Sequence, residues 1–460
     1  MWISIPFILV ITVVSNAQQM QFWLTDPDAN ITFEEQPSIP PNTDTYVGNL
    51  LISINDTVTF QTMDGIGFAL TDGCSLHLQN LSETVRDQIL EELFRTDKNN
   101  IGISYLRLSI GASDLDPAPY SYDDVPLGET DVNMTHFDLG FTRIHVLPIL
   151  KQILVINPNI KLLGSPWSPP AWMKTNKGTR GGFLLTKYFD AYALYFVRYI
   201  QEMAKEGFTI DAITVQNEPL FGLNNPSALM LASEQARFIK ESLGPAFEKY
   251  SIKTKILIFD DNCDTPDYPI KVLEDLDAKQ YVDGSTFHLY SGNITAMSQV
   301  HDRFPEKNVY LTERGVLAPS HFKKDFIWRI NNLIIGAPRN WAKTVLQWNL
   351  ASDPKFKPHT DTGCPTCLGA ITIDGDQITR NVGYYISAHA SKFVRPNSIR
   401  VDSTIVSGLP NVAFRTADTN QIILIVLNDN ETGTQTYQIQ CRGKIYNTSL
   451  HEGSAGTYIC

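Results

Sequence analysis

Long apolar runs, positive charge and low-complexity segments are all scarce in this chain of 460 residues. After the N-terminal segment no apolar run reaches the roughly 18 residues that a membrane span needs, so the mature chain is expected to be soluble. Acidic residues outnumber basic ones by 49 to 37 and the net charge is −12, which argues against nucleic acid as a partner. Internal repeats and Gly/Ser linkers are also missing. With 43% hydrophobic and 19% charged residues, the composition is that of a globular protein.

Cysteines are few as well, with six in the whole chain. The segment Cys364–Cys367 is close enough in sequence for a small loop disulfide. A zinc half-site would need a second Cys-x-x-Cys or a His pair, and a redox motif would need a thioredoxin-like context, and neither is found. Cys441 and Cys460 bracket the last β-rich segment and are predicted to close it. Cys74 and Cys263 are left over, either as buried thiols or as a third bridge.

The first 17 residues are apolar and end in small residues, so residues 1–17 are predicted to be a cleaved secretory signal. An uncleaved anchor is the alternative, because the segment lacks a basic residue. A secretory route gives meaning to the Asn-x-Ser/Thr sequons, which are glycosylation acceptors expected on the surface. The seven sequons begin at Asn30, Asn55, Asn80, Asn133, Asn293, Asn430 and Asn447. The predicted location is the secretory pathway, either secreted or lysosomal.

Short β-branched runs alternate with longer helical patterns over residues 60–391, which predicts βα units around a parallel sheet. The eight candidate strands are Met63–Phe68, Ile103–Leu108, Ile160–Gly164, Ala212–Gln216, Thr254–Phe259, Gly284–His288, Val309–Thr312 and Thr344–Trp348. The clearest helical patterns, with apolar residues three and four apart, are Leu81–Phe94, Tyr188–Glu206, Glu234–Tyr250 and Phe322–Ile335. Eight such units predict an α/β fold, a (β/α)8 TIM barrel.

The pattern changes after Arg395-Pro396 to short alternating strands with Gly and Asn turns and no helical periodicity. Examples are Val412–Arg415, Gln421–Leu427 and Thr436–Gln440. Residues 392–460 are therefore predicted to form a small antiparallel β-sandwich domain. Its missing strands are expected to come from residues 18–59, so that the two ends of the chain fold together.

Two of the predicted barrel strands end at a glutamate. Asn217-Glu218-Pro219 follows one strand, and Glu313 ends another. Reactive groups of barrels lie at the C-terminal ends of strands, and a pair of carboxylates is what glycoside hydrolysis requires. Glu218 and Glu313 are therefore predicted to be catalytic, although each could be an ordinary surface carboxylate. Asn217 is placed to hydrogen-bond the 2-hydroxyl of a sugar.

Seven segments carry a family resemblance: Asp64–Asp72, Ser104–Ser109, Gly164–Lys174, Gln216–Pro219, Phe287–Tyr290, Thr312–Glu313 and Trp348–Leu350. In this order they make the chain similar to the glucosylceramidase family, glycoside hydrolase family 30, over nearly its whole mature length. The resemblance implies retaining chemistry with Glu218 as acid/base and Glu313 as nucleophile. It also implies a glucose pocket with Arg107 behind it. The implied lining residues are Asp114, Trp167, Asn217, Tyr290 and Trp348.

Several of these residues also have a structural interpretation. Trp167 and Trp348 are either core aromatics or rings on which a sugar stacks. A buried Arg107 needs a carboxylate partner, for which Glu218 and Glu313 are the candidates. His288 is expected to support the site, or else to be a core histidine with its polar atoms satisfied. No metal or organic cofactor is implied, because two carboxylates suffice for the reaction.

The favoured function is a glucosylceramidase, which cleaves glucosylceramide to glucose and ceramide. The alternative is a secreted endo-β-1,6-glucanase that uses the same residues, and a carbohydrate-binding protein without catalysis is a remote third. Arg314 follows the predicted nucleophile, where lipid-cleaving members have smaller neighbours. The loops 220–226 and 363–367 resemble glucan-cleaving members as much as lipid-cleaving ones. The expected partner is a glucoside, either a glycolipid or a β-glucan. Contact with a membrane surface or an activator protein and the oligomeric state are left open.

Overall fold

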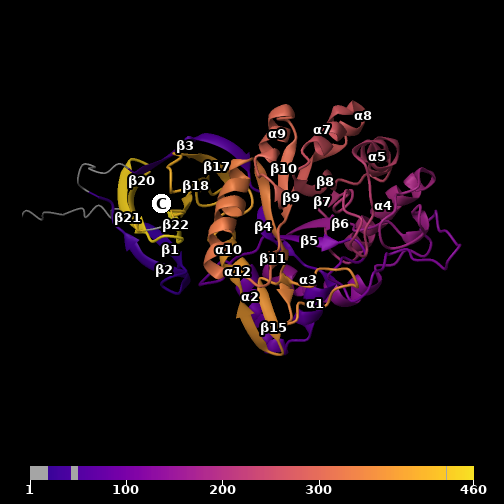
Figure 1. Cartoon of the computed structure of the whole chain (residues 1–460), viewed down its shortest axis with the longest axis horizontal. Helices are drawn as coiled ribbons and strands as arrows, with labels where there is room; N and C mark the ends of the chain where they lie inside the picture. Colours follow the sequence, from indigo (N-terminus) through magenta and orange to yellow (C-terminus); the bar gives the residue numbers. More distant parts are fainter. Residues whose placement is uncertain (1–18, 43–49, 431–432) are drawn as a thin grey trace, which may run out of the picture.

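The computed structural model describes residues 19–42, 50–430 and 433–460. The predicted signal at residues 1–17 lies outside these described residues. The chain forms a barrel and a separate β-domain, joined side by side (Figure 1). Among the helices in the described ranges, none has both the length and the apolar character that crossing a bilayer would demand.

Eight parallel strands close into a barrel, which confirms the predicted fold class. The barrel strands are β4 (Gly65–Ala69), β5 (Tyr105–Ser109), β6 (Lys161–Ser165), β7 (Ala212–Thr214), β8 (Lys255–Cys263), β9 (Val282–Gly292), β10 (Asn308–Glu313) and β12 (Ala342–Asn349). Pairing of β12 with β4 closes the ring. Six of these strands each contribute one residue to a buried cluster. Its members are Tyr105, Leu163, Ala212, Leu257, Tyr310 and Leu346.

Helices alternate with the strands and cover the outside of the barrel (Figure 1). They are α1 (Asp72–Gln79), α2 (Glu83–Phe94), α3 (Gly140–Ile156), α4 (Phe189–Lys205), α5 (Ala232–Phe238), α6 (Gly244–Lys249), α7 (Asp267–Glu274), α8 (Leu276–Lys279), α9 (Ala296–Arg303), α10 (Phe322–Arg329), α11 (Ala337–Arg339) and α12 (Val382–Ser391). Short 3₁₀ turns, η1 (Ala171–Met173) and η2 (Thr186–Tyr188), precede α4. The predicted helix 234–250 consists of α5 and α6, which are joined by a π-helical turn, η3 (Ile239–Leu243). The predicted helix 322–335 consists of α10 followed by a second π-helical turn, η4 (Ile330–Gly336).

The β-domain is built from both ends of the chain, as predicted. Within the described residues its strands are β1 (Met20–Asp26), β2 (Ile31–Ile39), β3 (Leu51–Thr62), β17 (Ile399–Ser403), β18 (Asn411–Arg415), β19 (Ile422–Leu427), β20 (Gln435–Cys441), β21 (Lys444–Leu450) and β22 (Ala455–Ile459). β1 pairs with β22, and β3 pairs with β17 and β20. The indigo and yellow strands therefore lie together in Figure 1. The predicted disulfide between Cys441 and Cys460 forms here, whereas Cys74 and Cys263 are buried free thiols.

Helix α12 joins the barrel to the β-domain, because it contacts β4 on one side and β2 and β22 on the other (Figure 1). His389 on this helix is fully buried. One ring nitrogen is 2.8 Å from the hydroxyl oxygen of Thr457 in β22, and the other is 2.8 Å from that of Thr25 in β1. Phe33 packs edge-on against the ring. One buried histidine thus connects the last barrel helix to strands from both ends of the chain.

Small strands after the barrel strands were not predicted from the sequence. They are β11 (Val316–Leu317), β13 (Ala351–Ser352), β14 (Cys367–Leu368), β15 (Ile371–Asp374) and β16 (Gln377–Arg380). β11 pairs with β14, and β13 pairs with β15. These pairings hold the loop 353–366 beside the chain that follows Glu313, and the predicted disulfide Cys364–Cys367 forms at its end.

Candidate active site

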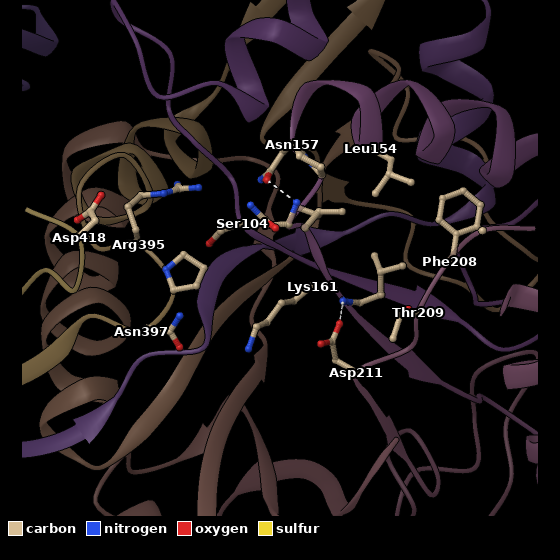
Figure 2. Close-up of a pocket in the computed structure, with 16 residues that line it drawn as sticks. Ser104, Leu154, Asn157, Lys161, Phe208, Thr209, Asp211, Arg395, Asn397 and Asp418 are labelled. Carbon is tan, nitrogen blue, oxygen red and sulfur yellow. Dashed lines mark hydrogen bonds between the residues drawn. The ribbon is translucent and has the colours of Figure 1, made fainter. Parts of the chain in front are cut away.

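Two cavities lie at opposite ends of the barrel. One, of about 340 Å³, opens where the strands end. The other, of about 860 Å³, lies beside the starts of β5, β6 and β7, where Ser104, Lys161 and Asp211 line it together with Arg395 and Asp418 (Figure 2). Because barrel chemistry is carried out at the C-terminal ends of the strands, the smaller cavity is the candidate active site. The predicted residues that line it are Asp114, Trp167, Asn217, Glu218, Tyr290, Glu313 and Trp348.

Glu218 lies beyond the strand that was predicted to carry it. β7 ends at Thr214, and Glu218 follows on a turn with a φ of 44°. This left-handed conformation is unusual for a residue with a Cβ and costs of order 1–3 kcal/mol. The turn is held by the Glu218 backbone N–H, which donates to the carbonyl of Asp260 at 2.9 Å. The side chain is half-buried and turned into the cavity.

Glu313 is the last residue of β10 and only 5% exposed. Arg107 donates to one of its oxygens at 2.6 Å, and the Tyr290 hydroxyl donates to the other at 3.0 Å. Burial raises the pKa of Glu313 and the nearby Glu218 adds to this rise, while His288 and Arg107 oppose it. Both oxygens are thus held in fixed positions.

The two carboxylates lie close together. One oxygen of Glu218, one oxygen of Glu313 and one ring nitrogen of His288 are all within 4.8 Å of one another. Retaining glycosidases hold their carboxyl groups about 5–5.5 Å apart, whereas inverting enzymes need about 6.5–9.5 Å to admit a water. The close approach of one oxygen from each carboxylate is compatible with the shorter, retaining spacing.

The same three side chains are a poor site for a metal ion. The neighbouring carboxylates of Glu313, Asp260 and Glu218 outweigh burial and raise the pKa of His288 to about 10, so its ring carries a proton at neutral pH. A protonated ring has no lone pair for a metal, and Arg107 already supplies a positive charge to Glu313. The arrangement favours acid/base and nucleophilic chemistry on an organic substrate.

Arg107 has the buried position that its sequence context predicts, at 1% exposed. Of the two predicted carboxylate partners, it pairs with Glu313. Its second terminal nitrogen donates to the side-chain oxygen of Asn217 at 2.7 Å and to Asp260 at 2.8 Å. The guanidinium also lies 4.9 Å from the ring centre of Trp167. Arg107 thus links the nucleophile candidate, the predicted sugar-binding amide and an aromatic wall.

Sequence reasoning missed Asp260, which lies at the centre of this network. It is fully buried, and the charge of Arg107 keeps its pKa well below the usual range in spite of that burial. Three hydroxyl groups donate to it at 2.7–2.8 Å, those of Ser165, Thr214 and Thr312. Phe259 and Asp260 both have positive φ, at an irregularity in the pairing of β8 with β9. Two consecutive aspartates at the end of an apolar strand were the available signal.

The remaining predicted residues form the cavity walls. Trp167 and Trp348 stack with ring centres 5.3 Å apart. Asp114 is 5% exposed, and its pKa rises to about 7 because of burial and the nearby Glu313. His288 lies beneath the cavity, with one nitrogen 3.5 Å from Glu218 and the other 3.3 Å from Asp260. All nine predicted residues are therefore brought to one place.

Comparison with known proteins agrees with the observed fold. Residues 63–394 match the model of the glycosyl hydrolase family 30 TIM-barrel domain, and residues 397–458 match that of its β-sandwich domain. The chain is 34% identical to an endo-1,6-β-D-glucanase of Aspergillus fumigatus, over 84% of this chain and 82% of that one. It is 28% identical to the lysosomal acid glucosylceramidase of Mus musculus, over 83% of this chain and 78% of that one. The solved structure of an endo-β1,6-glucanase superposes with a TM-score of 0.89 at 31% identity, and the match covers 96% of this chain and 99% of that one.

Proposed function

Because this chain belongs to glycosyl hydrolase family 30, a family of glycosidases, we propose that it is a retaining endo-β-1,6-glucanase. The observation that carries the proposal is the higher similarity to three endo-1,6-β-glucanases, at 31–34% identity, than to the mouse glucosylceramidase, at 28%. The proposed substrate is therefore β-1,6-glucan, the alternative in the sequence analysis, instead of glucosylceramide, which the sequence alone favoured. The motifs that carry the family resemblance left the leaving group open.

In the proposed reaction Glu313 attacks the anomeric carbon of a glucosyl unit. Glu218 donates its proton to the O6 leaving oxygen, and a covalent glycosyl ester with Glu313 remains. Glu218, now ionised, takes a proton from water, which attacks the anomeric carbon and frees Glu313. Arg107 and Tyr290 hold the two oxygens of Glu313 in position. Asn217, itself oriented by Arg107, is proposed to bind the 2-hydroxyl, and Asp114, Trp167 and Trp348 the rest of the ring.

Glucosylceramidase activity is the second candidate, because apolar side chains are exposed at the cavity mouth. Phe221 is 41% exposed and Leu317 is 44% exposed, and both line the cavity. Leu220 and Leu223, on the same loop as Phe221, are also exposed. Such a rim is suited to a lipid chain, but an aromatic or aliphatic side chain also packs against the C–H face of a sugar. The rim therefore supports a direct comparison of both substrates.

The test is to incubate the purified protein with a linear β-1,6-glucan and, separately, with glucosylceramide in detergent micelles. We expect the protein to release reducing ends from the glucan, with a kcat/KM for the glucan well above that for the lipid. Preferred cleavage of glucosylceramide would refute the proposed substrate. Binding of glucan without cleavage of either substrate would indicate the non-catalytic alternative.

Matched variants test the two roles. Glu313→Gln should abolish turnover because no nucleophile remains. Glu218→Gln should lower kcat on the glucan about 10²–10⁴-fold, the usual contribution of general acid/base catalysis. An aryl glucoside whose leaving group needs no proton should still form the glycosyl ester in this variant. Glu241→Gln, an exposed carboxylate paired with Arg237, is the control and should match the unmodified protein. Unchanged rates in both active-site variants would refute the assignment.

A further inference from the structure

The disulfide Cys364–Cys367 closes a turn that forms part of the candidate active-site wall. Residues 363–365 and Cys367 line the same cavity as Glu218 and Glu313. The sequence predicted the bond but indicated no role for it. The other disulfide, Cys441–Cys460, lies in the β-domain and closes strands far from this cavity.

The turn directly contacts the buried Asp114. The backbone N–H of Cys364 donates to a carboxylate oxygen of Asp114 at 3.2 Å. Gly363 packs so closely that a Cβ there would lie 2.2 Å from the Asp114 carbonyl oxygen. The same carbonyl accepts the Thr360 N–H at 2.9 Å. Both the backbone and the side chain of Asp114 are therefore positioned by this loop.

The loop is also tied to the segments that carry the two glutamates. Leu317, four residues after Glu313, pairs with Cys367 between β11 and β14, and the N–H of Ala318 donates to the carbonyl of Thr366 at 2.8 Å. On the other side, the Asn225 side chain donates to Asp361 at 2.7 Å. The turn therefore connects three chain segments that meet at the proposed glucose subsite.

We propose that the Cys364–Cys367 disulfide is a positioning element of the glucose subsite, which holds the Cys364 N–H against the Asp114 carboxylate and so sets the affinity for the glucosyl unit. The inference rests on the proposed function, because it takes Asp114 as a sugar-binding group. Opening the bond would free the turn between its two anchors. Asp114 would then lose a hydrogen bond and its defined orientation, while Glu313 would keep its contacts with Arg107 and Tyr290.

The test compares the unmodified protein with Cys364→Ala/Cys367→Ala. KM for β-1,6-glucan, and Kd for a glucose-configured iminosugar measured by calorimetry, should both rise about tenfold, as expected for the loss of one hydrogen bond. kcat should stay within about threefold, because the nucleophile and acid are untouched. Cys441→Ala/Cys460→Ala is the matched control and should leave both KM and Kd unchanged. An unchanged Kd in the first variant would overturn the inference.

A double-mutant cycle separates positioning from general loosening. In an Asp114→Ala background, opening the disulfide should raise Kd by much less than tenfold, because the side chain that the turn positions is already gone. An equal rise in both backgrounds would refute the positioning role. Gly363→Ala, which displaces the turn with both cysteines intact, should raise KM like the disulfide variant. Iminosugar binding without glucan cleavage would refute only the proposed substrate, and the Kd comparison would still decide this inference.

Discussion

The junction between barrel and β-domain is predicted to weaken in acid because of His389. Its ring nitrogens lie 2.8 Å from the hydroxyl oxygens of Thr25 and Thr457. Burial lowers its pKa to about 3, so the folded protein holds the ring neutral. In the unfolded chain a histidine titrates near 6.5. Between these values the unfolded state binds more protons, so stability falls as the pH drops from about 6.5 towards 3.

The magnitude follows from the shift. Each pH unit below 6.5 removes about 1.36 kcal/mol of the free energy of unfolding until the folded pKa is reached. At pH 4.5 the loss from His389 alone is therefore about 2.7 kcal/mol relative to neutral pH. Other titrating groups add their own contributions, so the quantity to measure is a difference between two proteins.

The experiment is urea unfolding of the unmodified protein and of His389→Gln at pH 7 and pH 4.5. The variant loses ring packing against Phe33 and is less stable at both pH values. Its loss between the two pH values should nevertheless be smaller by about 2–3 kcal/mol, since glutamine does not titrate. His321→Gln, at an exposed position, is the control and should behave like the unmodified protein. Equal pH dependence in all three would refute the reasoning.

Two further predictions concern buried charge and surface modification. Asp260→Asn should cost about 3–5 kcal/mol of stability, because Arg107 loses a buried partner. Asp261→Asn on the same strand should cost less, because it takes no partner from Arg107 and its amide oxygen still accepts one of the two backbone N–H groups, from Leu220 and Asn262, that the carboxylate holds. Equal shifts in the thermal midpoint would contradict this. If the chain is secreted, glycopeptide mass spectrometry should find little glycan at Asn430, because this residue is half-buried and its side-chain nitrogen donates to two oxygens at 2.7 and 2.9 Å. The other six sequon asparagines are exposed and should be modified more fully; a fully occupied Asn430 would contradict the reasoning.

Local patterns were enough to predict the barrel strands. Each is a short run rich in β-branched and apolar residues, and all eight predicted runs overlap an observed strand. The strand that ends at Glu313 was correctly placed for this reason. Helix α3 has no comparable prediction, because Pro148 inside it conceals its pattern. The π-helical turns in 234–250 and 322–335 were also missed, since they depend on packing against neighbours.

The site was predictable where residues follow strand ends and unpredictable where distant segments meet. Glu218, Glu313 and Arg107 were found because strand endings and buried charge leave a local signal. Asp260 was missed, because its direction depends on two residues with positive φ in the middle of β8. The contact between Cys364 and Asp114 spans 250 positions of sequence, and no local pattern reports it.

The sequence by itself determined the fold class, the pair of glutamates and the two disulfides, because periodicity, strand endings and cysteine spacing are local properties of a chain. Tertiary structure alone decided which residues meet. Arg107 binds Glu313 and Asp260, one oxygen of Glu218 lies within 4.8 Å of one oxygen of Glu313, and a disulfide-closed turn contacts Asp114. The physical reason is that closing the barrel brings the ends of non-adjacent strands together. The proposed leaving group, glucan instead of ceramide, rests on similarity over most of the chain and not on a local motif.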